Sequence, residues 1–464
     1  MTAAEFNAFN DTAAFLDLLR EIKLDPSGLF TSDSLIVTRA PGRLDVMGGI
    51  ADYSGSLVLP FPIAAATHVA IQLQDEPVIR IHSLSSDGEG TLRQVEMPLR
   101  SLMKDDAPVD YTDARAFFKR NPNDAWAAYV AGAFLVLMRE RGKVFERGAS
   151  IFISSAVPEG KGVSSSAALE VASMQAIGAA YDVHLSPLEV ALLCQRVENL
   201  VAGAPCGVMD QMTSVFGERD HLLTLLCQPA QLNGTIAIPE ELGIWGLDSG
   251  IRHSVGGADY GAVRTAAFMG YRIIAEVAGD NSWNGYLANI SPDVFEQNFA
   301  YSLPEQMRGE EFLKQYGGTT DSVTVVKPEQ TYHIRRATRH PIHEHARVQS
   351  FANILQNWQG LHQAEELGAL MYQAHDSYTS CGLNSSGTDE LVSLVREIGI
   401  YGGLYGARIT GGGSGGTVAV LGQRERAPAS IARIVETYAQ KNGYRPIVIS
   451  GSSSGASLFG HLRL

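Results

Sequence analysis

Residues 158–167 have the sequence Pro158-Glu-Gly-Lys-Gly-Val-Ser-Ser-Ser-Ala167, and they lie between two segments of different periodicity. The apolar run at 149–157 predicts a buried strand, and the helix formers at 168–180 predict a helix. Unpaired backbone N–H groups and the positive end of a helix dipole meet at such a junction, so it favours an anion such as phosphate. Taken alone, the stretch is at least as typical of a glycine-rich turn that ends in a serine N-cap. It is not a Walker loop, because no Gly-Lys-Ser/Thr follows four residues after a glycine.

The composition indicates a globular enzyme. The chain has 464 residues, of which 45% are hydrophobic and 19% charged, and this length suits two domains. Thirty-six basic residues against fifty acidic ones give a net charge of −14, which argues against nucleic acid and anionic membranes as partners. The four cysteines have no metal or redox spacing, and neither a signal peptide nor a membrane-spanning run is evident. We therefore expect a cytoplasmic protein; a monomer is the simplest expectation, since the sequence does not reveal the oligomeric state.

Prolines and glycines between residues 228 and 243 predict a domain boundary. We place it so that the first domain covers residues 1–235 and the second covers 236–464. Residues 281–345 are less regular and richer in polar and aromatic residues, and this predicts a helical insertion in the second domain.

Residues that end strands or cap helices predict further elements. An apolar run predicts a strand over 34–40 that ends at Pro41-Gly42. A helix is predicted from about residue 187 to 201, because Ser186 supplies an N-cap and Glu189 completes a capping box.

Four polar features could carry chemistry, and each also has an ordinary structural explanation. Arg43 lies just past the predicted strand, where it could be a surface ion-pair partner, and Asp210 lies in a loop constrained by glycine and proline, where it could be a cap. Glu198 could be a solvated helix residue, and the glycine run at 411–416 is by itself weak evidence of nucleotide binding. The order of these features along the chain carries more weight than any one of them.

Three motifs in order resemble those of the GHMP kinases, which include galactokinase and the homoserine, mevalonate and phosphomevalonate kinases. The first motif runs from Ala40-Pro-Gly-Arg43 to Asp52-Tyr53. The second is Pro158 to Ala168, and the third is the glycine-rich stretch from Thr410 to Gly416. The resemblance covers nearly the whole chain.

Shorter motifs resemble one branch of this superfamily. Cys206-Gly-Val-Met-Asp-Gln211 and Arg252-His-Ser with Tyr260 are similar to galactokinases. Val46-Met-Gly-Gly-Ile-Ala-Asp-Tyr53 and Leu303-Pro-Glu-Gln-Met-Arg-Gly-Glu-Glu-Phe312 resemble the kinase portion of plant L-arabinokinases.

The resemblance implies an α/β (α+β) fold of two domains, with ATP and Mg²⁺ in an active site between them. It implies that Asp210 lies beside the sugar's anomeric hydroxyl, that Arg43 lies near the transferring phosphoryl group, and that Ser166 and Glu198 bind magnesium. The residues implied to bind ATP are Gly160, Lys161, Gly162, Ser164, Ser165, Ser166, Ala167, Gly412 and Gly413. Those implied to contact the sugar are Asp52, Tyr260, Gly49, Ile50 and Gly207. Lys161 stands where the family often has a small residue, so its role is left open.

The expected function is an ATP-dependent sugar 1-kinase that makes L-arabinose 1-phosphate. Phosphoryl transfer needs positioning and charge neutralisation, which the implied cation, metal ligands and carboxylate supply. Galactokinases carry Glu-His-Thr where this chain has Gly49, Ile50 and Ala51, and that glutamate is associated with the hydroxymethyl group at C6. L-Arabinopyranose has the ring hydroxyls of galactose but no C6, so the replacement favours it.

The sequence leaves three alternative functions. D-Galactose remains the alternative sugar if selectivity comes from the 281–345 insertion. A non-catalytic sugar sensor is the less favoured alternative, because such relatives can lose part of the second motif, and Ser164-Ser-Ser-Ala167 is intact. A nicotinamide dehydrogenase would need a spaced glycine pattern with an acid about 20 residues further on, and the sequence does not supply it convincingly.

Overall fold

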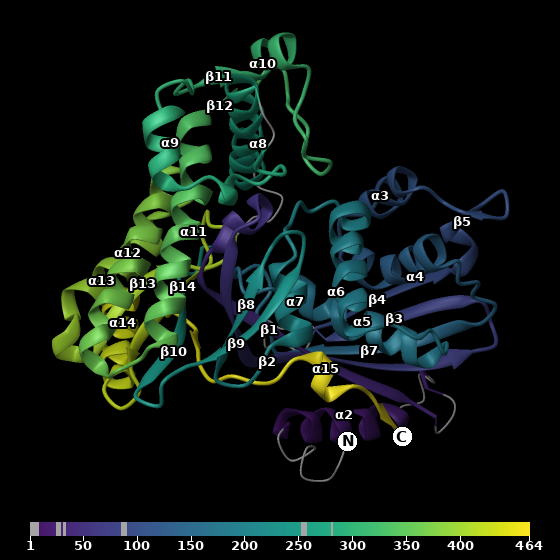
Figure 1. Ribbon diagram of the computed structural model, residues 1–464. Coiled ribbons are helices and arrows are strands. Elements are labelled where there is room, and N and C mark those ends of the chain that lie inside the picture. Colours follow the sequence, from purple (N-terminus) through teal and green to yellow (C-terminus); the bar gives the residue numbers. More distant parts are fainter. Residues whose placement is uncertain (1–8, 25–28, 31–33, 85–90, 252–257, 280–281) are drawn as a thin grey trace.

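Two β-sheets organise the chain in a computed structural model that describes residues 9–24, 29–30, 34–84, 91–251, 258–279 and 282–464 (Figure 1). The strands of the larger sheet are β1 (Ile36–Met47), β2 (Leu57–Gln74), β3 (Val78–Leu84), β4 (Leu92–Pro98), β7 (Gly148–Ser155), β8 (His221–Leu226), β9 (Gln231–Ala237) and β16 (Leu462–Arg463). Its order is β16-β1-β2-β7-β3-β4, with β8 pairing with β2 and β9. All of these pairs are antiparallel except β3 with β7.

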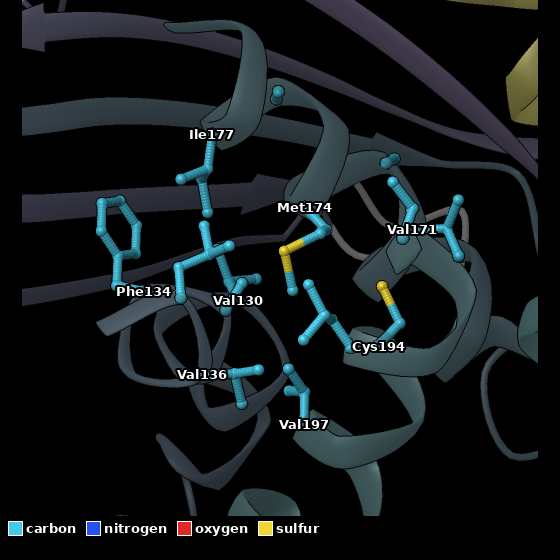
Figure 2. Packing of buried hydrophobic residues seen from close by; sticks show 14 of the residues in the cluster. Val130, Phe134, Val136, Val171, Met174, Ile177, Cys194 and Val197 are labelled. Atoms are coloured by element: carbon cyan, nitrogen blue, oxygen red, sulfur yellow. The ribbon is translucent and has the colours of Figure 1, made fainter. Parts of the chain in front are cut away.

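Helices cover both faces of the larger sheet. They are α2 (Asn10–Leu24) on one face and, on the other, α4 (Ala128–Arg141), α5 (Ser165–Ala180), α6 (Pro187–Arg196) and α7 (Met209–Phe216). Side chains alternate along β2, so that Val69 and Ile71 face the core below α5 while Ala70 faces Phe15 of α2. Figure 2 shows the apolar core between the helices, where α4, α5 and α6 contribute Val130, Phe134, Val171, Met174, Ile177 and Cys194.

Strand β1 runs further than the sequence predicts. It continues through Pro41-Gly42 to Met47, and all of its residues are buried. The pairing register with β2 shifts between Pro41 and Arg43 and again between Asp45 and Met47. Pro41 has no N–H to donate, and the irregular pairing at this point allows the strand to continue past it. The predicted strand end at Pro41 is therefore wrong. Arg43 therefore lies within a buried strand.

The smaller sheet has the order β13-β14-β10-β15 and belongs to the second half of the chain. Its strands are β10 (Leu242–Asp248), β13 (Leu404–Ile409), β14 (Thr417–Gln423) and β15 (Val448–Ile449). The long helices of this half are α8 (Ala258–Ala278), α11 (Ile334–Gln356), α12 (Ala364–Ser380), α13 (Ser386–Ile398) and α14 (Ala427–Asn442). The two sheets share one apolar core, in which Leu44 and Phe61 meet Ile244, Phe351 and Met371.

Short elements complete the fold. They are α3 (Tyr111–Lys119), α9 (Pro292–Asn298), α10 (Gly309–Tyr316), α15 (Ala456–Phe459), the ribbon of β5 (Met103–Lys104) with β6 (Ala107–Pro108), and that of β11 (Met307–Arg308) with β12 (Thr331–Tyr332). The end of the chain returns to the larger sheet, where β16 pairs with β1, and it lies near α2 in Figure 1. No helix in the part of the chain that the structure describes is both long and apolar enough to cross a bilayer.

Candidate active site

A cavity with about 680 Å³ of empty space, part of which is open solvent, lies where β1, the start of α5 and the third glycine-rich motif meet. The predicted site residues on its wall are Arg43, Gly49, Ile50, Asp52, Gly160, Gly162, Ser164, Ser165, Ser166, Glu198, Gly207, Asp210, Tyr260 and Gly412. The wall also includes Pro205, Cys206, Met209 and Gly411, which were not predicted as site residues. Lys161, Ala167 and Gly413 lie outside this lining.

The turn before α5 is shaped to receive an anion. Ser164 has the left-handed conformation, with φ of 60°, and its side chain makes no capping hydrogen bond to the helix. Its buried hydroxyl oxygen has no hydrogen-bond partner among the described residues. A buried hydroxyl of this kind needs a partner, and the amides at a helix N-terminus bind phosphate, so the turn fits the phosphates of ATP.

Asp210 and Arg43 form a two-pronged ion pair. Arg43 Nε and Nη2 each donate to a different carboxylate oxygen of Asp210, both at 2.9 Å. Arg43 Nη1 donates to the Gly162 carbonyl at 2.6 Å. The arginine side chain is 5% exposed, whereas that of Asp210 is 21% exposed and lines the cavity. The pair therefore holds a carboxylate beside the turn before α5.

Ser166 and Glu198 also meet in the cavity. Ser166 Oγ donates to Glu198 Oε1 at 2.8 Å, and the side-chain amide of Gln211 bridges Glu198 at 2.6 Å and Glu170 at 3.1 Å. Burial, and then the nearby Asp210 charge, raise the pKa of Glu198 to about 7. Glu198 lies in a π-helical turn, Val197–Ala202, so the helix predicted to reach 201 leaves the α conformation after α6 ends at Arg196.

Hydroxyl and carboxylate oxygens suit Mg²⁺, which takes few protein ligands and completes its shell with water and phosphate oxygens. Ser166 and Glu198 fit such a site. Among the residues that the structure describes, no group of three or more His, Cys, Asp or Glu side chains could hold a metal ion.

The proposed sugar side is built around Asp52. This residue lies in the short 3-10 helix Gly49–Ser54, and burial, followed by the Asp210 charge, raises its pKa to about 7. Gly207 faces it so closely that a Cβ atom there would lie 1.8 Å from Asp52 Oδ2. Tyr260, near the start of α8, packs edge to face on Tyr53 with ring centroids 6.1 Å apart.

Arg264 is a neighbour of this site that the sequence analysis missed. It makes a two-pronged ion pair with Asp321, both bonds at 2.8 Å, and donates to the Cys206 carbonyl at 3.1 Å. Its side chain is 7% exposed and its charge lowers the pKa of Asp52, against the larger effect of burial. Because Arg264 follows Tyr260 by one helical turn, helical spacing could have indicated it.

Lys161 and the motif at Arg252 behave differently from the other predicted residues. Lys161 Nζ lies 2.8 Å from the Asp248 carboxylate, and its ammonium packs over the ring of Tyr444 at 5.3 Å. Arg252-His-Ser lies outside the described residues.

Comparisons with known proteins show which family the chain is similar to. Three family models match: the GHMP kinases N terminal domain over residues 128–218, the GHMP kinases C terminal over 352–440, and the galactokinase galactose-binding signature over 28–73. The chain belongs to the GHMP kinases.

Two relatives in that family are similar to this chain over most of its length. The chain is 45% identical over 94% of its length to L-arabinokinase from Arabidopsis thaliana, and it spans about half, 47%, of that protein. It is 27% identical to galactokinase from Chloroflexus aggregans, over 91% of this chain and 93% of the relative.

Solved structures share the fold. The crystal structure of Lactococcus lactis galactokinase complexed with galactose matches with a TM-score of 0.74 and 20% identity, covering 95% of this chain and 99% of that one. Methanococcus jannaschii mevalonate kinase matches with a TM-score of 0.55 and 13% identity, covering 89% and 98%. The expected GHMP kinase fold is thus confirmed.

Proposed function

We propose that the chain transfers the γ-phosphoryl group of ATP to the anomeric hydroxyl of a monosaccharide, and that this monosaccharide is L-arabinose. The observation that carries the proposal is the Asp210–Arg43 pair, which shares one cavity with the start of α5 and with the Ser166–Glu198 pair. A carboxylate, a cation, an anion-binding helix end and hard oxygen ligands are the groups that phosphoryl transfer needs.

Each group has a task that its position supports. The amides at the start of α5 and the Ser164 hydroxyl bind the ATP phosphates. Ser166 and Glu198 would hold Mg²⁺, which neutralises charge on phosphate oxygens when it is bound. Asp210 accepts the proton that the sugar's O1 loses as the new O–P bond forms and the bond from the γ-phosphorus to ADP breaks. Arg43 keeps that carboxylate beside the phosphate-binding turn.

Two observations favour L-arabinose. Ile50 brings an apolar side chain to the cavity wall, and Gly49 has no side chain where galactokinases carry the glutamate associated with C6. L-Arabinopyranose has no C6 and so needs no polar group there. The 45% identity to Arabidopsis L-arabinokinase supports the same sugar, while the galactose-binding signature over 28–73 supports D-galactose as the second candidate.

A panel of pure monosaccharides with ATP and Mg²⁺ tests the proposal, with ADP release giving the rate and NMR the phosphorylated position. We expect L-arabinose 1-phosphate, and a kcat/KM for D-galactose about 5- to 150-fold lower, because a hydroxymethyl group buried without a partner costs roughly 1–3 kcal/mol. Equal efficiency on both sugars would contradict the choice of L-arabinose. A phosphate on another hydroxyl would contradict the role of Asp210, and binding without turnover would indicate a sensor.

A further inference from the structure

Tyr378 is a buried residue, outside the cavity lining, that connects two walls of the proposed active site. It lies on α12 with a fully buried side chain. Its hydroxyl accepts a hydrogen bond from the Ile50 N–H at 2.8 Å and donates one to the Gly411 carbonyl at 2.9 Å. Ile50 belongs to the proposed sugar side and Gly411 to the third glycine-rich motif, and both line the cavity. One hydroxyl group therefore joins the sugar side to the phosphate side.

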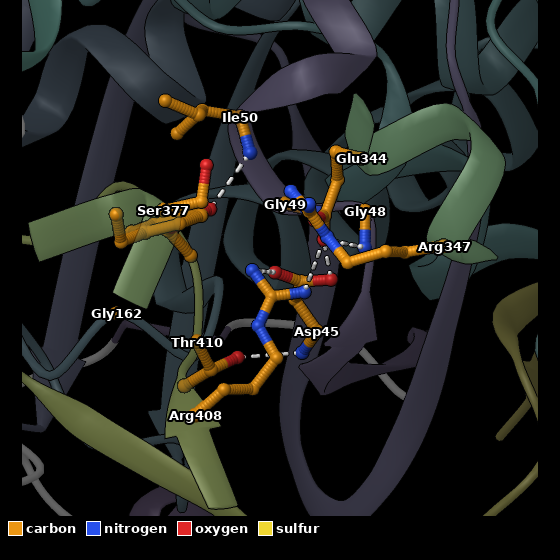
Figure 3. Close-up of polar contacts among 12 residues, drawn as sticks. Asp45, Gly48, Gly49, Ile50, Gly162, Glu344, Arg347, Ser377, Arg408 and Thr410 are labelled. Carbon is orange, nitrogen blue, oxygen red and sulfur yellow. Dashed lines mark hydrogen bonds and ion pairs between the residues drawn. The ribbon is translucent and has the colours of Figure 1, made fainter. Parts of the chain in front are cut away.

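The two residues before Ile50 are also held by buried side chains (Figure 3). The Gly48 N–H donates to Glu344 Oε1 at 3.1 Å, and the Gly49 N–H donates to Asp45 Oδ1 at 3.0 Å. Both carboxylates are fully buried. Three successive backbone N–H groups thus donate to three side chains, one each from β1, α11 and α12. These hydrogen bonds fix the path of the turn.

Arg408 completes this network. Its guanidinium lies 3.1 Å from Glu344 and 3.4 Å from Asp45, between the two carboxylates, and packs over the Tyr378 ring at 4.9 Å. The ion pairs and the ring hold one another in place, so Tyr378 has little freedom to move away from the turn.

The Tyr378 hydroxyl occupies the space that a side chain at position 49 would need. Gly49 has φ of +52°, and a Cβ atom built on it would lie 1.8 Å from the Tyr378 oxygen, the nearest atom, and 2.8 Å from both Arg408 Nη2 and Asp45 Oδ2. The glutamate of galactokinases could not enter here while the tyrosine stays in place. The identity of residue 49 is therefore tied to a residue that is 329 positions away in the sequence.

We propose that Tyr378 is a specificity-determining positioning residue of the sugar site. Its hydroxyl holds the turn at Ile50 against the glycine-rich motif and excludes any side chain at position 49, which keeps the pocket to the size and polarity of a pentose. This inference rests on the proposed function and names the group behind its sugar preference.

The first test is Tyr378→Phe, which removes the hydroxyl and keeps the ring. It leaves a buried N–H and a buried C=O without their partner, so kcat/KM for L-arabinose should fall roughly 10- to 100-fold. The ratio of kcat/KM for L-arabinose to that for D-galactose should fall towards one, because the released turn makes room at Ile50. A purely structural role would lower both efficiencies alike and leave the ratio unchanged.

Tyr181→Phe is the matched control. Tyr181 is also buried and donates its hydroxyl to a backbone carbonyl, that of Arg147, at 2.9 Å, but it does not line the cavity. This variant should keep the wild-type efficiency and the wild-type ratio.

A double-mutant cycle tests the contact with position 49. Gly49→Ala alone should be strongly impaired in sugar binding, because its methyl group collides with the Tyr378 hydroxyl. In the Tyr378→Phe background the same substitution should cost less, because the nearest contact is gone, while the contacts with Arg408 and Asp45 and the strain of the positive φ remain. The two effects should therefore be less than additive. Additive effects would overturn the proposal even if each single variant is impaired.

The outcomes separate this inference from the function on which it rests. Equilibrium binding of L-arabinose without ATP, and thermal melting to establish folding, are measured for every variant. A folded Tyr378→Phe protein with the wild-type sugar ratio overturns this inference alone. A wild-type protein that neither binds nor phosphorylates L-arabinose or D-galactose overturns the proposed function first, and this inference with it.

Discussion

Among single residues, Asp210 carries the most direct prediction. Asp210→Asn keeps the shape of the side chain and one acceptor for Arg43, but it removes the proton acceptor. We expect turnover to fall about 10²- to 10⁴-fold, with ATP binding nearly unchanged. Steady-state rates and a thermal-shift titration with ATP measure the two effects. Asp182→Asn, at a 92% exposed side chain, is the control, and an Asp210→Asn protein with near-normal turnover would remove Asp210 from its role.

Asp52 carries a prediction about pH. Burial and the Asp210 charge raise its pKa from 3.8 to about 7, so the folded protein holds a proton there that the unfolded chain releases. Stability from this group is therefore present at low pH and is lost as the pH rises from about 4 through 7. We expect Asp52→Asn to gain melting temperature relative to the wild type between pH 5 and pH 8. A pH-independent difference in melting temperature would contradict the shifted pKa.

The same ionisation should appear in sugar binding. A carboxylate accepts hydrogen bonds from sugar hydroxyls better than a carboxylic acid does, so the wild-type KM for L-arabinose should fall as the pH rises through 7. In Asp52→Asn this step should disappear.

Local motifs predicted which polar residues lie together in the site, but not which buried residues support them. Arg43, Ser166, Glu198 and Asp210 meet in one cavity, as the resemblance to the GHMP kinases implied. Asp210→Asn tests the role of Asp210, and the roles of the other three residues stay predictions. Tyr378 was missed because its partners Ile50 and Gly411 lie 328 and 33 residues away in the sequence, and no local pattern marks such contacts.

Among helices and strands, the predictions held where the signal was local. The capping box at Ser186 and Glu189 is present, with both reciprocal hydrogen bonds, and α6 begins at the predicted Pro187. The π-helical turn after α6 and the passage of β1 through Pro41 were not predicted, because both depend on packing against distant segments. The sequence around each of these two positions does not indicate which distant segment packs against it.

The predicted insertion at 281–345 is partly helical. It contains α9, α10 and the first turns of α11, separated by loops and by the β11–β12 ribbon. Asp321 in one of these loops pairs with Arg264, so the insertion reaches the residue that bonds the Cys206 carbonyl at the cavity wall. The sequence could indicate an irregular insertion, but this contact depends on the tertiary fold.

In the whole molecule, the order of the three motifs predicted the fold, whereas the course of the chain end was not predictable. β16 adds an edge strand to the larger sheet, although it follows all of the second half in sequence. The pairing involves two residues on each strand, too few to leave a pattern in the sequence. The boundary near residue 235 stays a prediction.

Lys161 shows how the two halves are held together. It extends from the turn before α5 to Asp248 at the end of β10. The Asp248 side chain is 1% exposed, and that of the lysine is 16% exposed. Asp248 also accepts hydrogen bonds from the Tyr444 hydroxyl and, at 3.1 Å, from the Gly250 N–H. The pair therefore joins the turn that is proposed to bind phosphate to the smaller sheet, and Lys161 lies outside the cavity lining.

Lys161→Met should therefore weaken the assembly of the two halves more than the binding of ATP. Removing one partner of a buried pair leaves the other charge unpaired, so we expect the free energy of unfolding to fall by roughly 3 kcal/mol in urea titrations. Adding Asp248→Asn should recover part of this loss, since it removes the unpaired charge. Glu159→Gln breaks the exposed pair with Arg93 and should cost about 1 kcal/mol or less. A raised KM for ATP at unchanged stability would instead show that Lys161 leaves Asp248 to bind phosphate.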